Sequence, residues 1–311
     1  MSVPRTRRSA FWLTLLAAAA VGVAACGSSS SNSTSSSSTA VASNAVTVAG
    51  VYPPAAALVP AAIKSKGTLI VAADATYAPN EFVASNGHTV IGMDPDLMKA
   101  LGEVMGLKVN VVNATFDTII PGLQSGKFDV GMSSFTDTKA REAVVNFVDY
   151  FTAGESFFEK ASGGPTLPSG LASICGLKVA VESGTTEESD AQTQSKKCVS
   201  AGKPAVTVLI FPDQNSANLA LASGRAQLGF ADSPVAAYQV KQSAGKFRLV
   251  GVSFENAPYG IAVPKSSGTL DKAILTGLEF LVRNGQYETI LKKWGVQAGA
   301  DDAPAINGAT S

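Results

Sequence analysis

Thr68-Leu-Ile-Val-Ala-Ala73 is an apolar run of strand length, and the residues that follow it decide the fold class. Asp94 and Pro95 are typical of the N-cap and the first residue of a helix, and apolar residues then recur on one face as far as residue 105. Residues 108–112 have the pattern of a second strand. A strand, a helix and a strand in this order predict a parallel unit with a right-handed crossover.

The same alternation continues along the rest of the chain. Further strands are predicted at residues 129–132, 178–181, 206–211 and 227–230, and helices at residues 117–124, 186–196, 215–223, 234–243, 270–284 and 286–294. Strands that alternate with helices are typical of α/β sheets of the parallel type, with helices on their faces. Ligands of such sheets bind at the carboxyl ends of the strands.

Polar and aromatic residues directly follow the predicted strands. They are Asp74 and Tyr77 after the first strand, Phe116 at the start of the loop after the second, Ser133, Ser134, Thr136 and Arg141 after the third, Glu182 to Thr186 after residue 181, and Asp232 after residue 230. A guanidinium and the N–H groups of a helix N-terminus bind a carboxylate, and a carboxylate binds an ammonium group. Together these residues could hold a zwitterion, although arginine and aspartate at strand ends are also common as solvated surface residues.

Seven stretches of the chain resemble, in order and spacing, the family 3 solute-binding proteins of ABC importers, which capture polar amino acids. They are Gly67 to Asp74, Gly92 to Leu97, Phe116 to Leu123, Asp129 to Arg141, Val179 to Thr186, Tyr259 to Pro264 and Asn284 to Trp294. The resemblance covers the chain from Gly67 to about Gly295. Between Asp129 and Arg141 the fit to the histidine- and glutamine-binding members needs no gap. We therefore expect a substrate-binding protein that serves ABC permease subunits.

The resemblance also implies a fold and a domain organisation. We expect an α/β fold of two lobes, the type II periplasmic-binding-protein-like fold, with two crossing hinge segments near residues 155–160 and 253–258. Lobe 1 would comprise residues 67–156 and 257–298, lobe 2 residues 157–256, and residues 299–311 would form a disordered tail. Family members close over their ligand by hinge motion, and the closed population is what the permease recognises.

Carried over by position, the family pattern assigns five residues to the two charged groups of an amino acid. Arg141 would bind the α-carboxylate, assisted by the backbone N–H groups of Thr136 and Thr186. Asp232 would accept hydrogen bonds from the α-ammonium group. The Ser134 carbonyl and the Thr136 hydroxyl would be further acceptors for that group.

The resemblance places another set of residues around the ligand side chain. Tyr77 and Phe116 would sandwich that side chain, although packing in the core is an alternative for both. Asp74 and Glu182 would line the far end of the pocket, and Ser133 belongs to the same expected ligand-binding set. Because an unpartnered buried carboxylate is costly, two acids at this end favour a cationic or amide amino acid. Glutamate and aspartate are disfavoured ligands.

Two other functions remain open from the sequence. Some relatives of this fold are enzymes such as cyclohexadienyl dehydratases, in which Glu182 could serve as an acid or base because burial raises the pKa of a carboxyl group. The sequence contains no pair of a nucleophile and a histidine and no metal-ligand set, so we expect neither catalysis nor a cofactor. The other alternative is a ligand-sensing subunit or an adhesin without a transporter.

The N-terminus has the pattern of a bacterial lipoprotein signal. Arginines precede an apolar run that ends in Val23-Ala24-Ala25-Cys26, so residues 1–25 would be the signal peptide and Cys26 the lipidated (palmitate-bearing) N-terminus. An ordinary cleaved signal is the alternative, whereas the run is short of the ~20 residues that a transmembrane helix needs. Residues 26–66 would be a Ser-rich tether with a short helix. The protein would then be exported and held on the outer face of the cytoplasmic membrane, by Sec or Tat export.

Charge argues against a nucleic-acid partner. Without the three arginines of the signal, 21 basic side chains stand against 24 acidic ones, and the basic residues are not clustered. We expect a monomer whose partners are a small-molecule amino acid, the permease and the membrane.

Two cysteines remain when Cys26 is lipidated. Cys175 and Cys198 are an even pair in an oxidising compartment, which favours a disulfide. Metal binding is the alternative, but the only histidine, His88, is distant in sequence.

Overall fold

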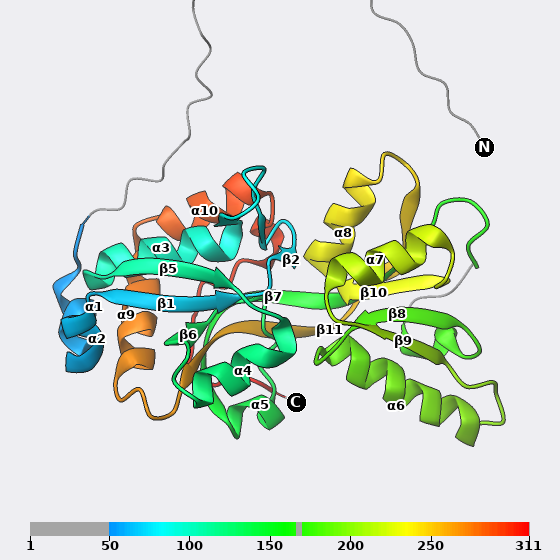
Figure 1. Cartoon of the computed structure of the whole chain (residues 1–311), viewed down its shortest axis with the longest axis horizontal. Coiled ribbons are helices and arrows are strands. Elements are labelled where there is room, and N and C mark those ends of the chain that lie inside the picture. The colour runs from blue at the N-terminus through cyan, green and yellow to red at the C-terminus, as the bar shows by residue number, and fades with distance from the viewer. Residues whose placement is uncertain (1–49, 166–169, 311) are drawn as a thin grey trace, which may run out of the picture. The chain divides into compact units, whose positions relative to one another are not determined.

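The eight-stranded sheet of this protein extends through two lobes. The computed structural model describes residues 50–165 and 170–310 (Figure 1). The predicted signal peptide and Cys26 lie outside the described residues. The strand order is β5-β1-β6-β11-β7-β10-β8-β9, and a separate three-stranded sheet has the order β2-β3-β4. Two long strands in the middle of the order, β7 and β11, connect the lobes.

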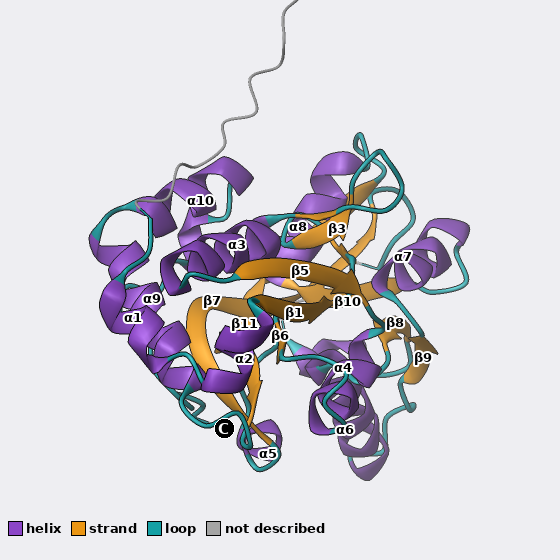
Figure 2. Cartoon of the chain, turned by 60° about the vertical axis from the view of Figure 1, so that its left-hand side comes forward, coloured by secondary structure: helices purple, strands orange, loops and turns teal. Residues whose placement is uncertain are grey.

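The first lobe contains the parallel strands β5 (Lys108–Asn113), β1 (Thr68–Ala73) and β6 (Val130–Gly131). Its helices are α1 (Pro53–Leu58), α2 (Ala61–Lys66), α3 (Met93–Met105), α4 (Phe116–Gln124), α5 (Lys139–Glu142), α9 (Leu270–Arg283), α10 (Gln286–Trp294) and the 3-10 turn η2 (Gln297–Gly299). The strands of the small sheet are β2 (Thr76–Tyr77), β3 (Glu81–Val83) and β4 (Val90–Ile91). Helices lie on both faces of the strands (Figure 2), and α3, α9 and α10 bury one continuous apolar core against them.

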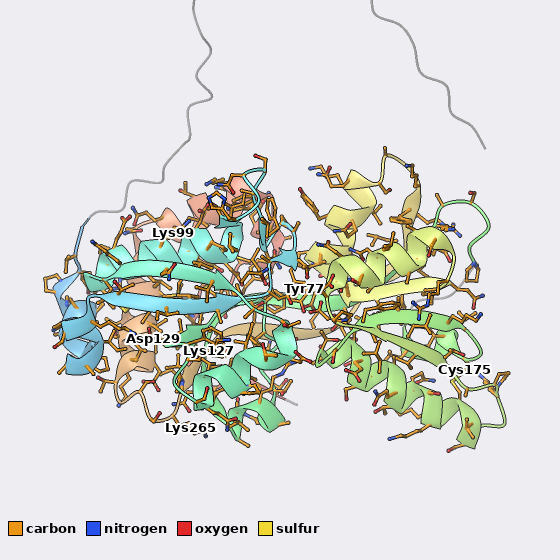
Figure 3. All side chains as sticks on the ribbon, viewed as in Figure 1. Tyr77, Lys99, Lys127, Asp129, Cys175 and Lys265 are labelled. Atoms are coloured by element: carbon orange, nitrogen blue, oxygen red, sulfur yellow. A yellow bond between two sulfur atoms is a disulfide. The ribbon has the colours of Figure 1, made fainter. Side chains whose placement is uncertain are left out.

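The second lobe repeats the same arrangement. Its parallel strands are β10 (Leu228–Asp232), β8 (Lys178–Glu182) and β9 (Thr207–Phe211). Its helices are the 3-10 turn η1 (Leu171–Ile174), α6 (Thr186–Ser200), α7 (Gln214–Ser223) and α8 (Ser233–Gln242). The Cys175–Cys198 disulfide joins the residue after η1 to the last turn of α6, with 5.6 Å between the Cα atoms. It lies far from Tyr77, at the outer end of the lobe (Figure 3).

Two antiparallel strands pass between the lobes. β7 (Val145–Lys160) pairs with β11 (Phe247–Pro264) along most of its length, and β7 residues 155–158 also pair with β10. The register of β11 shifts between Val250 and Phe254 and again between Phe254 and Ala257. These irregularities fall where the sequence predicted the second crossing. The proposed boundaries between the lobes stay a prediction.

The predicted starts of two elements need correction. α3 begins at Met93 with Gly92 as its N-cap, so Asp94 is not the cap. Gly92 has a φ of 141°, and a Cβ there would overlap the backbone carbonyl of Asn80. Phe116 is the first residue of α4 rather than part of a loop. In contrast, β1 and α10 have the bounds that the sequence predicted.

The folded part begins earlier than predicted. Residues 53–66 form two short helices, separated at Pro60, instead of one helix on a tether. Ala55 is fully buried, and the ring of Tyr52 stacks on that of Phe280 in α9, with 4.3 Å between centroids. The Thr269 hydroxyl donates to the Leu58 carbonyl at 2.5 Å. This segment therefore belongs to the first lobe because it covers apolar surface of α9.

The end of the chain was also predicted wrongly. Residues 299–310 are not a disordered tail, because they run along the edge of β7, with isolated antiparallel bridges between Phe151 and Ala300 and between Val148 and Ile306. The backbone N–H of Asp149 donates to the Ala305 carbonyl at 2.8 Å. Within residues 50–165 and 170–310, every helix is too short or too polar to span a bilayer.

Candidate functional site

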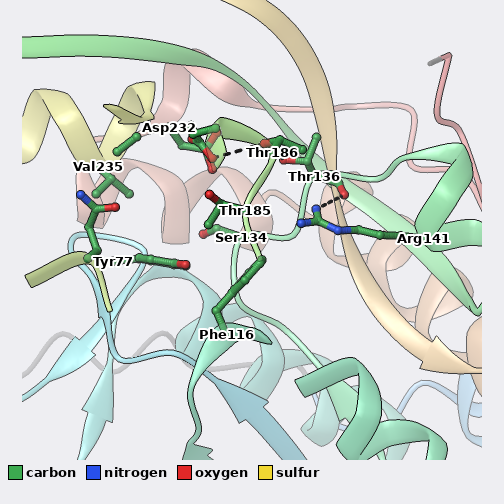
Figure 4. Close-up of a pocket in the computed structure, with 12 residues that line it drawn as sticks. Tyr77, Phe116, Ser134, Thr136, Arg141, Thr185, Thr186, Asp232 and Val235 are labelled. Atoms are coloured by element: carbon green, nitrogen blue, oxygen red, sulfur yellow. Dashed lines mark hydrogen bonds between the residues drawn. The ribbon is translucent and has the colours of Figure 1, made fainter. Parts of the chain in front are cut away.

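A pocket lies between the two lobes, where the predicted binding residues meet (Figure 4). Its lining consists of Tyr77, Phe116, Ser134, Thr136, Arg141, Thr185, Thr186, Glu187, Gln214, Ala231, Asp232 and Val235. Seven of these belong to the ligand-binding set predicted from the sequence. Asp74, Ser133 and Glu182, the other three, do not line this pocket. The sequence analysis missed Glu187, Gln214, Ala231 and Val235, and it favoured a turn residue over a ligand contact at Thr185, which also lines the pocket.

Arg141 is held at the junction of the lobes. Its guanidinium donates through Nη1 to the Thr136 carbonyl at 2.7 Å and through Nη2 to the Gly184 carbonyl at 3.0 Å. It also lies over the ring of Phe116, with 5.4 Å from Cζ to the centroid. Burial lowers the pKa of Arg141, but a guanidinium stays protonated in proteins. The site therefore presents a fixed positive charge with a planar set of donors, as a carboxylate requires.

Two carboxyl groups lie on the second-lobe side of this guanidinium. Asp232 ends β10 and is the N-cap residue of α8, but its side chain makes no capping hydrogen bond. Glu187 lies in the first turn of α6, is 4% exposed and accepts from the Thr186 hydroxyl at 3.3 Å. Burial, followed by the charge of Glu187, raises the pKa of Asp232 well above its usual value. A ligand ammonium group would stabilise the ionised form of this pair.

Ser134 is fixed in a left-handed backbone conformation by a buried network. Its φ is 52°, its backbone N–H donates to Asp94 Oδ2 at 2.9 Å, and its hydroxyl accepts from Asn80 Nδ2 at 2.9 Å. Tyr150 also donates to the Asp94 carboxylate at 2.8 Å. Burial raises the pKa of Asp94 to about 6 and that of Glu81 well above its usual value. These groups hold the Ser134 backbone in a conformation that non-glycine residues rarely adopt.

Asp74 and Ser133 lie behind the pocket wall. The Asp74 carboxylate accepts from the backbone N–H of Phe116 at 3.0 Å and from the Thr76 hydroxyl at 2.7 Å. The Ser133 hydroxyl accepts from the Asp74 N–H at 2.8 Å and donates to Glu81 Oε1 at 3.0 Å. The Asp74 side chain therefore positions the start of α4, and the Ser133 hydroxyl binds the backbone of Asp74. Direct ligand contact by either one stays a prediction.

Glu182 is a buried carboxyl group beside Tyr77. It is 1% exposed, and neither of its oxygens, nor the Tyr77 hydroxyl, has a hydrogen-bond partner among the described residues. Burial, followed by the charge of Asp74, raises the pKa of Glu182 to about 10. Burial and then the charge of Glu182 raise the pKa of Tyr77. Glu182 does not itself line the pocket, but beside the pocket residue Tyr77 it leaves hydrogen-bonding capacity that a buried cation or amide could use.

The aromatic residues of the site line the pocket and also pack in the apolar core. Tyr77 and Phe116 have ring centroids 5.7 Å apart at an angle of 57°, and Phe116 stacks on Phe135 at 4.4 Å. Both Tyr77 and Phe116 line the pocket and also belong to an apolar cluster of the core. The two interpretations from the sequence, ligand contact and core packing, are therefore compatible.

The lobes contact each other around the pocket. The backbone N–H of Gln214 in the second lobe donates to the Thr76 hydroxyl in the first at 3.2 Å. The Ser183 hydroxyl donates to Asp117 at 3.4 Å, and the hydroxyls of Thr136 and Thr186 are 3.5 Å apart. These contacts come from segments on either side of the crossing strands, so the pocket is enclosed by both lobes.

Known proteins that resemble this chain bind small solutes. Residues 69–297 match the family described as bacterial extracellular solute-binding proteins, family 3. The arginine-binding protein ArgT of Corynebacterium glutamicum is 34% identical over 252 residues, which are 81% of this chain and 82% of the relative.

Two solved structures are similar over the same region. An ancestral arginine-binding protein bound to arginine is 38% identical with a TM-score of 0.67, and the match covers 73% of this chain and 98% of that protein. The ancestral amino acid-binding protein AncCDT-1, a precursor of cyclohexadienyl dehydratase, is 35% identical with a TM-score of 0.67, over 75% of this chain and 97% of that protein.

Proposed function

The chain belongs to family 3 of the bacterial extracellular solute-binding proteins, and we propose that it captures a cationic amino acid, arginine foremost, and delivers it to an ABC permease. Its similarity to an arginine-binding protein and to an ancestral arginine-binding structure supports this ligand class. Lysine and ornithine carry the same side-chain charge as arginine, and glutamine can donate hydrogen bonds from its side-chain amide.

The buried Glu182 is the observation that carries the proposal. A carboxyl group without a hydrogen-bond partner costs free energy, and a ligand that supplies a cation or donor recovers it. The neighbouring Tyr77 and Phe116 offer flat faces on which a guanidinium stacks. An acidic side chain would instead be buried beside Glu182 and Asp74 without a cation to pair with it, so glutamate should bind poorly.

The other end of the pocket suits the common part of every amino acid. We propose that Arg141 binds the α-carboxylate together with the N–H groups of Thr136 and Thr186. Asp232 then accepts from the α-ammonium group, with the Ser134 carbonyl as a second acceptor. Glu187 adds negative charge to that side of the pocket.

Hinge motion about β7 and β11 would open and close the site. We propose that the chain passes between the lobes at residues 156–157 and again at residues 256–257, in a monomer. A ligand that contacts both lobes stabilises the closed population, which the permease then recognises.

The N-terminal sequence supports a lipid anchor. We propose that residues 1–25 are removed and that Cys26 carries palmitate-type acyl chains, which hold the protein on the outer face of the cytoplasmic membrane. The variant Cys26→Ser should no longer incorporate labelled palmitate and should leave the membrane fraction. Retention of label in that variant would contradict the anchor.

Calorimetric titration with the twenty protein amino acids and ornithine tests the proposed ligand class. Arginine, lysine or ornithine should bind tightest, with glutamine weaker and glutamate undetectable. Tight glutamate binding without a response to arginine or glutamine would refute the class, and no binding of any amino acid would refute the function.

An enzymatic role is a second candidate that one observation favours. The raised pKa of Glu182 keeps a proton available at neutral pH, as a general acid needs, and AncCDT-1 is described as the precursor of a dehydratase. Incubation with prephenate or arogenate, followed by ultraviolet absorbance of the aromatic product, separates the two roles. We expect no turnover.

A further inference from the structure

We infer that the C-terminal segment of residues 300–309, here called the strap, positions Arg141 for ligand binding. This inference rests on the proposed role of Arg141 in holding a ligand carboxylate. The strap lies beyond residues 69–297, the part that matches the family.

The strap is fixed along the edge of β7 before it reaches the binding site. The backbone N–H of Asn307 donates to the Phe147 carbonyl at 3.0 Å, and the Asn307 side-chain oxygen accepts from the Phe147 N–H at 2.8 Å. Asn307 has a φ of 58°, and its backbone N–H and side-chain oxygen bind both backbone groups of Phe147 at one edge of β7. This anchor determines where the next two residues lie.

Those next two residues donate to three carboxylates. The N–H of Gly308 donates to Asp149 Oδ2 at 2.9 Å. The N–H of Ala309 is shared between Asp137 Oδ2 and Glu142 Oε1, at 3.2 Å to each. Ala309 is 6% exposed and Asp137 1% exposed, so this shared hydrogen bond is shielded from water.

Asp137 and Glu142 stand on either side of Arg141 in the chain. Between them lie Thr138 and the first three residues of α5, a helix of only four residues in which no residue is fully buried. Its cap is the Thr138 hydroxyl, which accepts from the Arg141 N–H at 3.2 Å. Apolar packing contributes little to holding so short a helix. The Ala309 N–H donates to residues at both ends of the segment that carries the guanidinium, and these hydrogen bonds therefore help to fix it.

A glycine substitution can displace the strap without removing it. A Cβ on Gly308 would overlap Asp149 Oδ2, so Gly308→Ala should move Ala309 away from Asp137 and Glu142. Ala303→Val is the matched control, since Ala303 is exposed in the same segment.

Hydrogen exchange of the ligand-free protein is the first readout. In Gly308→Ala the amides of residues 141–144 should exchange about tenfold faster, equivalent to roughly 1.4 kcal/mol, while those of α9 stay unchanged. Unchanged exchange at residues 141–144 would overturn the inference whether or not any amino acid binds.

Calorimetric titration with L-arginine is the second readout. Gly308→Ala should weaken binding by about tenfold, and it should have a much smaller effect when Arg141→Lys is already present, because the strap acts through Arg141. Equal effects in both backgrounds would overturn the inference. Faster exchange at residues 141–144 in a protein that binds no amino acid would support the tie to α5 but refute the proposed function.

Discussion

Arg141 donates to a backbone carbonyl in each lobe, so its guanidinium responds to closure as well as to ligand. Arg141→Ala should weaken arginine binding by about 2–5 kcal/mol, because the ligand carboxylate would be buried without its partner. Calorimetry measures the loss of affinity. Arg283 is exposed on α9, and Arg283→Ala serves as the control. Equal affinity of the Arg141 variant and the wild type would remove the carboxylate assignment.

The raised pKa of Glu182 predicts that ligand binding releases a proton. Its pKa of about 10 means that it is protonated at neutral pH without ligand, and a bound guanidinium would favour its ionised form. Arginine binding should then release a proton, and affinity should rise from pH 6 to pH 8. Titrations in buffers of different ionisation enthalpy detect the release, which Glu182→Gln should reduce. Proton uptake or no proton exchange by the wild type would contradict this account.

At the scale of elements, α6 presents its N-terminal residues to the pocket, and its C-terminal end carries the disulfide. The Cys175–Cys198 bond closes a loop whose ends are 23 residues apart, which corresponds to about 3 kcal/mol in the chain-entropy model. The double variant Cys175→Ser with Cys198→Ser should lose about that much free energy of unfolding in urea. Arginine affinity should stay unchanged because Thr186 lies at the opposite end of the helix. An equally stable double variant would show that the loop is constrained by packing alone.

The whole molecule holds several carboxyl groups whose pKa values burial raises. Burial raises the pKa to about 10 for Glu155 and Glu182 and to about 7 for Asp137. The unfolded chain ionises these groups near pH 4, so between pH 5 and 9 the folded protein binds more protons than the unfolded one. Its stability should therefore fall as pH rises across this range.

Thermal melts of the ligand-free protein at pH 6 and pH 9 check this direction. The melting temperature should be lower at pH 9, and Glu155→Gln should reduce the difference, because an amide does not titrate. A melting temperature that rises with pH would contradict the buried, protonated state of these groups.

Much of the fold was predictable because it depends on local pattern. The apolar run of β1 and the periodic faces of α3 and α10 are readable from neighbouring residues. The long strand β7 was not, since it is buried on both faces and contains buried Asp149, Glu155 and Glu159, which break any alternation.

Part of the candidate site was likewise predictable from the sequence, and part was not. Sequence by itself determined the family resemblance and a set of residues, among them Arg141 and Asp232, that the fold brings into one pocket. Only the tertiary structure decided that Glu187 shares that pocket and that the strap meets Asp149 and Asp137 from 159 and 172 residues away. The strap has no apolar period of its own, and its order comes from hydrogen bonds to those distant carboxylates, which no local pattern can encode.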